Sequence, residues 1–510
     1  MLPSQRAPRR QRCARSCPGA KIDLQFINVK PDDPDQKSQT REIVRANAAY
    51  FHWRHNRPPR NKAKVKQSGH RRDKKVPRDD DDFKPLPPMN SAHLGADVDP
   101  FSPYDINLPR ALVNHCIAFN AHYFLPALFP DGANSFNARA NLIQMSTSNA
   151  CVLHMFITGA LINSQGIRGA IPSSRIARDM FQSRAKIVRG LNIAIQDPKE
   201  ACKDINIFAV TALTKKEASQ RMQELPSRTP NQGPLKRLQL LHLLALSEID
   251  PIHYEGLSQL IELKGGLDKI EIPGLAALIS LGGLLVATRN CTSPRFPVVA
   301  LSDQTSEFTH YDQEIYINTD QDILVVLSML KSYTIMIDDF CEGRKVVPAS
   351  VLLDHRNAAQ HALLSLLPRV GRSECYRLAV MIYALLVTFP IPYTVAPFEC
   401  LVTRLKMALA EWDGDDYGLL WVLAMGGIGA TGLEERMWFV KDFQSVVARM
   451  GVGSWIETKD IIKRGLWHEA TNDGDGQDLW VESTLMVEGT HFCKEKGHLR
   501  IYDKPLVLGF

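Results

Sequence analysis

Residues 419–482 read LLWVLAMGGIGATGLEERMWFVKDFQSVVARMGVGSWIETKDIIKRGLWHEATNDGDGQDLWVE, and this stretch says most about the fold. Apolar residues recur in it at helical spacing, and the interruptions fall where helices begin or end. Thr431 with Glu434 and Ser454 with Glu457 fit the capping box, in which a hydroxyl and a carboxylate bind free backbone amides. The stretch predicts short helices and shows no catalytic set. We expect tryptophan rings to pack these helices together: Trp421, Trp438, Trp455 and Trp467.

A second helix is predicted in residues 250–268, which read DPIHYEGLSQLIELKGGLD. Asp250 suits the N-cap, and the proline that follows it suits the first helical position. Gly265 and Gly266 can end the helix in left-handed geometry. Three apolar residues share one face of this helix: Leu257, Leu260 and Ile261.

Both stretches resemble the fungal-specific transcription factor domain. In 419–482 the resemblance lies in the Gly-Gly-Ile run, the Glu-Arg … Trp-Phe-Val helix and the helix opened by Ser-Trp. A weaker match covers 24–57. The middle pattern, His-x-x-Gly-Leu … Gly-Gly-Leu, falls on His253, Gly256, Leu257, Gly265, Gly266 and Leu267. The resemblance implies a helical regulatory domain that influences transcription in the nucleus. It also implies contacts with other transcription factors, with itself or with a small-molecule effector of unknown identity.

A zinc cluster is not expected, although it is the usual DNA-binding module of that family. The cluster needs six thiolates close together, whereas here Cys13 and Cys17 are followed by the next cysteine only at Cys116. Two thiolates cannot complete a tetrahedral zinc site. The ten cysteines are scattered and form no disulfide framework. The sequence therefore predicts no metal, no cofactor and no autonomous zinc-cluster DNA-binding domain.

Positive charge is concentrated at the N-terminus. Residues 1–78 hold 21 Lys and Arg against 6 Asp and Glu, whereas the rest of the chain holds 40 against 49. Such a basic arm can act as a nuclear import signal or contact phosphates non-specifically through residues 41–78, and its alternative is a solvated tail. The residues that would carry this role are Arg57, Arg60, Lys62, Lys64, Lys66, Arg71, Arg72, Lys74, Lys75 and Arg78.

The chain is expected to be all-α beyond this arm. Residues 1–100 are predicted to be mostly disordered with one short helix at about 40–54, residues 101–470 to form the helical domain, and residues 471–510 to be a tail packed on it. A short strand is expected at 298–301. The predicted helices are 105–128, 136–162, 172–196, 203–224, 235–247, 251–264, 273–288, 321–339, 350–366, 374–389, 395–411, 415–428, 432–449 and 455–464.

Two short motifs suggest chemistry, and neither has the context it needs. Gly427, Gly429 and Gly432 match the GxGxxG dinucleotide pattern, but no βαβ unit surrounds them. Asp473 and Asp475 begin like a calcium loop that then lacks the required Gly and Glu, so a Gly/Asp turn is expected there. We expect no enzyme activity. A dinucleotide-binding enzyme using the Gly427-Gly429-Gly432 turn and a non-catalytic helical scaffold remain the alternative functions.

The apolar runs at 274–288 and 378–389 fall short of the roughly 18–20 residues that a membrane span needs. Both are expected to be core helices, and no membrane partner is expected.

Overall fold

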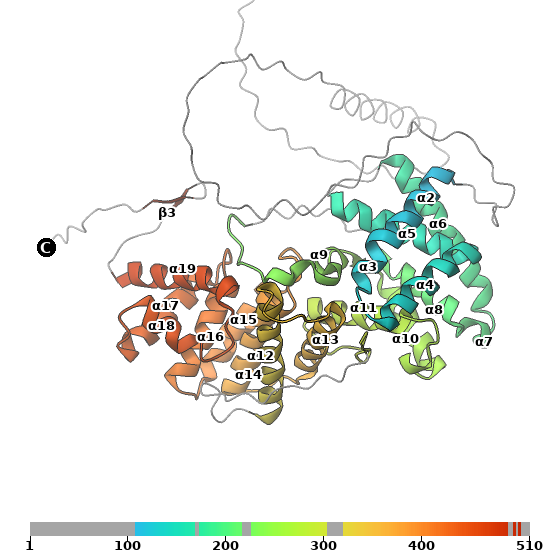
Figure 1. Ribbon diagram of the computed structural model, residues 1–510. Helices are drawn as coiled ribbons and strands as arrows, with labels where there is room; N and C mark the ends of the chain where they lie inside the picture. The colour runs from blue at the N-terminus through green and yellow to red at the C-terminus, as the bar shows by residue number, and fades with distance from the viewer. Residues whose placement is uncertain are drawn as a thin grey trace, which may run out of the picture. The chain divides into compact units, whose positions relative to one another are not determined.

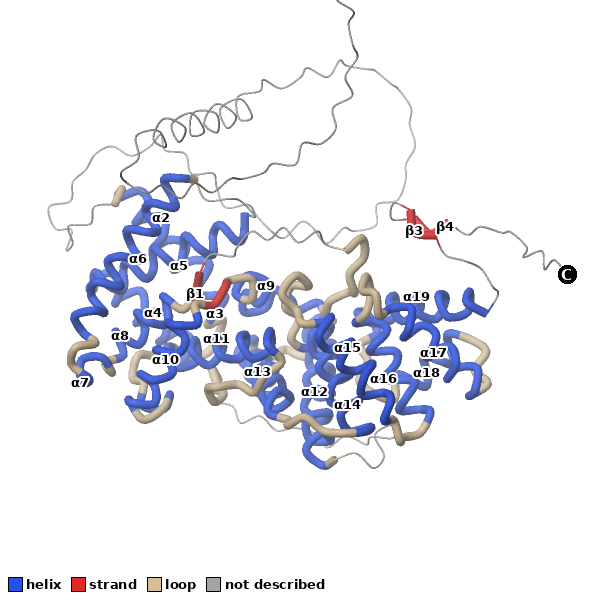
Figure 2. Tube along the Cα trace, turned by 180° about the vertical axis from the view of Figure 1, so that it is seen from behind, coloured by secondary structure: helices blue, strands red, loops and turns tan. Residues whose placement is uncertain are grey.

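The computed structural model describes residues 108–168, 173–216, 226–302, 320–487, 493–495 and 498–500. The predicted arm, its helix at 40–54 and all ten basic residues proposed for import lie outside these ranges. The described chain is mainly α-helical, as predicted (Figures 1 and 2). Its α-helices are α2 Arg110–Phe119, α3 Leu125–Leu128, α4 Ala133–Ser148, α5 Ala150–Arg168, α6 Ser174–Ala194, α7 Pro198–Ala201, α8 Asp204–Leu213, α9 Leu241–Leu244, α10 Pro251–Lys264, α11 Leu275–Asn290, α12 Gln321–Cys341, α13 Ala349–Ser365, α14 Gly371–Tyr383, α15 Phe398–Ala408, α16 Asp416–Gly429, α17 Arg436–Met450, α18 Trp455–Ile462 and α19 Glu469–Val487.

Shorter elements join these helices. Two π-helical turns continue neighbouring α-helices, η1 at Asn120–Phe124 and η4 at Ala384–Thr388. The 3₁₀ turns are η2 Pro234–Leu240, η3 Leu267–Lys269 and η5 Leu409–Glu411. The strands form two antiparallel pairs, β1 Lys215–Lys216 with β2 Glu248–Ile249, and β3 Cys493–Glu495 with β4 His498–Arg500.

Helix α5 is central to the N-terminal part of the described chain. It contacts α2, α4, α6, α8 and α9. Nearly every position from Val152 to Ser164 is buried, which fits a helix that is apolar around most of its circumference. Helix α6 is amphipathic instead, and the buried face that it places against α5 includes Met180, Ile187 and Leu191. These helices form the scaffold around the candidate site.

Helices α14 and α16 are central to the C-terminal half, as α5 is to the N-terminal part. Helix α16 contacts α14, α15, α17, α18 and α19, and it is buried along its length from Leu420 to Gly429. Trp421 is fully buried, and its indole N–H donates to the carbonyl of Leu466 at 2.9 Å. The predicted packing of this stretch by tryptophans is confirmed, with Trp467 buried and Trp438 and Trp455 half-buried.

Several caps follow the prediction. Asp250 accepts from the backbone N–H groups of Ile252 and His253, and Gly265 ends α10 with φ +95°. Ser454 caps α18 by accepting from the N–H of Glu457 at 3.3 Å. These residues set the helix ends through local hydrogen bonds, which is why their spacing is readable in the sequence.

The predicted capping box at Thr431 is wrong. The Thr431 hydroxyl donates to the carbonyl of Ile428, and α17 begins later, after Glu435. Because this hydroxyl is bonded to the last turn of α16, it does not cap the N-terminus of α17.

Four other expectations need correction. The single helix predicted at 136–162 is divided at Asn149 into α4 and α5. The predicted helix 203–224 ends at Leu213, because the chain turns into β1, which pairs with β2. Residues 298–301, where a strand was expected, form no strand. The expected Gly/Asp turn at 473–478 lies inside α19, where Asp475 accepts from the backbone N–H of Asn231 at 2.7 Å and so serves tertiary packing.

No single helix in the described ranges is long and apolar enough to cross a membrane. Helices α4 and α5 satisfy the length and composition only as a pair, and they meet at 115°.

Candidate ligand cavity

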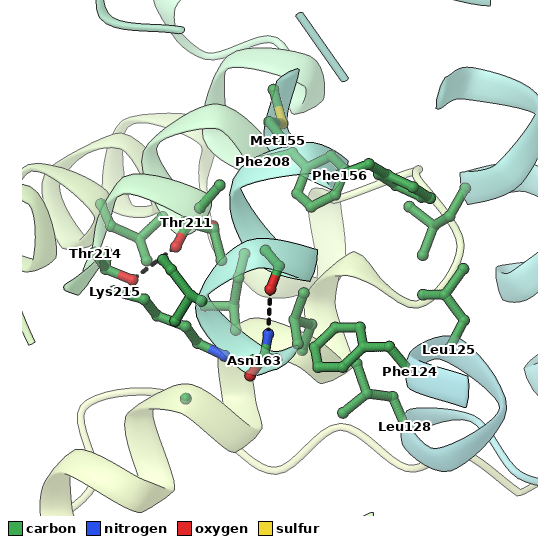
Figure 3. A pocket seen from close by; sticks show the side chains of 18 of the residues that line it. Phe124, Leu125, Leu128, Met155, Phe156, Asn163, Phe208, Thr211, Thr214 and Lys215 are labelled. Carbon is green, nitrogen blue, oxygen red and sulfur yellow. Dashed lines mark hydrogen bonds between the residues drawn. The ribbon is translucent and has the colours of Figure 1, made fainter. Parts of the chain in front are cut away.

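An apolar cavity of about 100 Å³ lies where the N-terminal helices meet, and Figure 3 shows it from close by. Its walls come from η1, α3, α4, α5, α8, α10 and α11, together with β1 and β2. An engineered apolar cavity of about 150 Å³ holds a benzene molecule, so this space accommodates a small apolar group.

One side of the cavity is hydrocarbon. Phe124, Leu125 and Leu128 line it from η1 and α3, and Met155 and Phe156 line it from α5 (Figure 3). The π-helical turn η1 shifts this part of the chain out of α-helical register. Its first residue, Asn120, donates both amide hydrogens to backbone carbonyls, those of Cys116 at 2.8 Å and Phe156 at 3.0 Å. Such turns are frequent at functional sites, and here the turn is anchored directly onto α5.

The other side carries polar atoms, and Lys215 is the charged one. Side chains alternate between the two faces of a strand. Lys215 is paired with Ile249 in the β1–β2 register, and both residues line the cavity. Lys216 lies on the opposite face, where its amine is 2.9 Å from the carboxylate of Asp250. The register therefore separates two adjacent lysines into one that faces the cavity and one that forms an ion pair.

The backbone of β1 is held in place by α6. The Arg184 guanidinium donates to the carbonyl of Lys215 at 2.8 Å and to that of Leu213 at 3.3 Å. Because these bonds fix the carbonyls on both sides of Thr214, the direction of the Lys215 side chain is set by tertiary contacts.

Burial lowers the pKa of the Lys215 amine to about 8. The residue as a whole is half-buried, and most of the side chains that line the cavity with it are apolar. No carboxylate of the described residues pairs with this amine, and none of the side chains that line the cavity is acidic. A lysine with this pKa is still mostly protonated near pH 7, which places an unpaired positive charge at an apolar cavity.

Neighbouring polar side chains can accept hydrogen bonds, because the hydroxyl hydrogens of Thr211 and Thr214 and one amide hydrogen of Asn163 are used elsewhere. The Thr214 hydroxyl donates to the carbonyl of Thr211, and the Thr211 hydroxyl donates to that of Ile207. The Asn163 amide donates to the carbonyl of Gly159 at 2.7 Å, and Figure 3 shows the Lys215 amine directed toward Asn163. The polar side of the cavity thus combines a cation with acceptor oxygens.

Two glycines in the cavity wall leave open space. A Cβ at Gly159 of α5 or at Gly282 of α11 would meet no atom within 4 Å. Gly283, the next residue, differs because its Cβ would lie 2.7 Å from the ring of Phe296. The cavity therefore exists partly because side chains are missing at positions 159 and 282.

A second, more polar cavity of about 740 Å³ adjoins the first. Four residues line both: Ile249, Tyr254, Gly283 and Val286. The second cavity also contains Arg289, which donates to the carbonyl of Ser247 at 2.8 Å, and Arg295, which pairs with Glu255. The lining of the second cavity also contains Glu248, so it carries charges of both signs.

The glycine motif predicted as an alternative dinucleotide turn has a different geometry. Gly427 and Gly429 lie inside α16, where added Cβ atoms would be 2.8 Å from side chains of Leu479 and Ile382. At Gly432 a Cβ would be 2.5 Å from the carbonyl oxygen of Arg228. Side chains and backbone fill the space that a pyrophosphate would need, so the motif marks close helix packing.

Within the described ranges, no group of three or more His, Cys, Asp or Glu side chains is placed to hold a metal ion. Cys13 and Cys17 lie outside those ranges. Asp473, the first residue of the calcium-loop pattern, accepts from the Trp467 indole at 2.8 Å and pairs with Lys459.

Sequence reasoning missed the cavity and its lysine. Lys215 falls within the helix predicted at 203–224, and the sequence analysis assigns it no role. One sequence feature could have indicated a cavity here: Asn163 is a polar residue in the otherwise apolar helix α5.

Comparison of the chain with protein-family models, with curated proteins and with solved structures finds no match.

Proposed function

We propose that this chain is a nuclear transcriptional regulator whose helical domain binds a small apolar effector in the cavity described above. The observation that carries the proposal is the cavity itself, with a hydrocarbon side and a charged side. One of its walls is α10, the helix that contains His253, Gly256 and Leu257 of the family-like pattern. The regulatory role rests on the resemblance to the fungal transcription factor domain.

The cavity offers a physical route from effector to regulation. Helices α5, α8, α10 and α11 are separate elements of the chain, and each contributes to its wall. A ligand that fills the space stabilises the arrangement in which all four meet, and so shifts the population toward it. A partner protein that recognises that arrangement binds more tightly when the ligand is present. We infer that the partners are other transcription factors or a second copy of this chain, because no zinc cluster is present in the sequence.

The test places the full chain at a promoter through a fused heterologous DNA-binding domain and measures reporter transcription. Wild type is compared with Gly159→Leu, which fills the cavity from α5, and with Lys216→Met, which alters the opposite face of β1. We expect wild type and Lys216→Met to change transcription alike and Gly159→Leu to differ. If a folded, nuclear wild-type fusion leaves transcription at the level of the DNA-binding domain alone, the proposed function fails.

A further inference from the structure

We propose that the cavity binds a small apolar monocarboxylate whose carboxylate pairs with the Lys215 ammonium while its hydrocarbon part lies against Phe124, Leu125 and Leu128. This inference rests on the proposed effector site and names the chemistry of the effector. It is carried by geometry: a cation at one side of an apolar cavity, a hydrocarbon wall at the other and no acidic side chain in the lining.

The charge argument begins with the unpaired amine. A buried charge without a partner is costly, and proteins normally pair it or place it in water. Lys216, one residue away, has such a partner in Asp250, and Lys264, in α10, has one in Asp204. Lys215 has none among the described residues, although it is directed into the cavity. An anionic ligand supplies the missing partner.

The polar atoms around the amine limit the form of the anion. The hydroxyl hydrogens of Thr211 and Thr214 and one of the two amide hydrogens of Asn163 are committed to backbone carbonyls. A dianionic phosphate or sulfate would leave a second negative charge unbalanced against the one ammonium in a mostly apolar cavity. A single carboxylate can be bound by the ammonium through one charge-assisted bond while its second oxygen faces the more polar neighbouring cavity.

The size of the cavity limits the hydrocarbon part. A volume of about 100 Å³ is smaller than the cavity that holds benzene, so a short alkyl chain is a better match than a ring, and a long lipid chain does not fit.

The test is a binding titration of the purified full chain with sodium hexanoate, using hexanamide as the neutral analogue and hexylammonium as the cationic one. We expect saturable binding of hexanoate, weaker binding of hexanamide and none of hexylammonium. The matched variants are Lys215→Met, which keeps the length of the side chain and removes its charge, and Lys216→Met on the outer face.

Lys215→Met should weaken hexanoate binding about 10- to 100-fold, the usual worth of a hydrogen bond to a charged group, and leave hexanamide binding unchanged. Lys216→Met should bind hexanoate as wild type does, and Gly159→Leu should bind neither ligand. The proposal is overturned if Lys215→Met binds hexanoate as tightly as wild type, if hexanamide matches hexanoate, or if neither hexanoate nor benzoate binds in the millimolar range.

A second measurement needs no variant. An amine-acylating reagent at pH 8 should label Lys215, and hexanoate should protect it while leaving the labelling of Lys216 unchanged, as followed by peptide mass spectrometry. Equal labelling of Lys215 with and without hexanoate contradicts the proposal. Both measurements use purified protein, so they remain informative if the reporter experiment shows no role in transcription.

Discussion

At the scale of single residues, the lowered pKa of Lys215 should make the folding stability of the protein depend on pH. The pKa of its amine falls from an ordinary 10.5 to about 8 in the folded chain. Below about pH 8 both folded and unfolded chains hold the proton, so the penalty of burying the charge is present in full. Between about pH 8 and 10.5 the unfolded chain holds more protons than the folded one, so the stability of wild type rises with pH.

The prediction that follows compares Lys215→Met with wild type by chemical denaturation across pH. Near pH 7 the variant should be the more stable, by at most on the order of 3 kcal/mol, because each pKa unit corresponds to about 1.4 kcal/mol. The difference should shrink as pH rises from about 8 to 10.5. Lys216→Met should instead lose about 0.2–1 kcal/mol, the worth of an exposed ion pair. A pH-independent difference between Lys215→Met and wild type would show that the amine is not enclosed.

A second residue-scale prediction concerns the tryptophan cluster. Trp467 is buried, its indole N–H donates to Asp473 at 2.8 Å, and its ring lies against Gly476 of α19. Trp467→Ala should therefore cost about 3–5 kcal/mol of unfolding free energy. Ser454→Ala, which removes only the cap of α18, should cost about 0.5–2 kcal/mol. Urea denaturation measures the loss of unfolding free energy in each variant. Equal losses in the two variants would contradict the assigned packing of Trp467.

At the scale of elements, glycines in helices separate close packing from open space. A Cβ at Gly426 in α16 would lie 2.3 Å from the ring of Phe439, which is fully buried and cannot move aside. We predict that Gly426→Ala destabilises by about 1–3 kcal/mol or more. Gly282→Ala in α11 meets nothing and should stabilise by up to about 1 kcal/mol through helix propensity. Thermal denaturation of the two variants shows whether each substitution raises or lowers stability. A stabilising Gly426→Ala would refute the assigned contact between α16 and Phe439.

Elements whose ends are set by local chemistry could be predicted from the sequence. Helix α10 follows the prediction from Pro251 to Lys264, because Asp250 and Gly265 bind its free backbone groups directly. The strand pair was not predictable, because two-residue strands exist only through pairing across the chain. The position of the cavity lysine depends on that pairing and on Arg184 of α6, so no local signal around Lys215 could reveal it.

At the scale of the whole molecule, the all-α class was predictable because helical periodicity persists over most of the sequence. The candidate site was not, because its walls come from segments spread between Asn120 and Val286. The pattern of apolar residues shows that each helix has a buried face. It does not show that Gly159, Gly282 and Lys215 come together around an unfilled space.

The last prediction concerns the charge asymmetry between the N-terminal arm and the rest of the chain. Two basic clusters lie within 57–66 and 71–78, and such clusters are recognised by import receptors through their charges. Replacing Arg57, Arg60, Lys62, Lys64, Arg71, Arg72, Lys74 and Lys75 with Gln should leave a fluorescent fusion in the cytoplasm. The helical domain should be unaffected, because the packing described above involves none of these residues. A matched control replaces eight Lys and Arg side chains of the helical domain that form no ion pair, and it should still concentrate in the nucleus. If the arm variant also concentrates there, import depends on another segment or on a partner, and the role assigned to the arm fails while the cavity and its ligand remain open to their own tests.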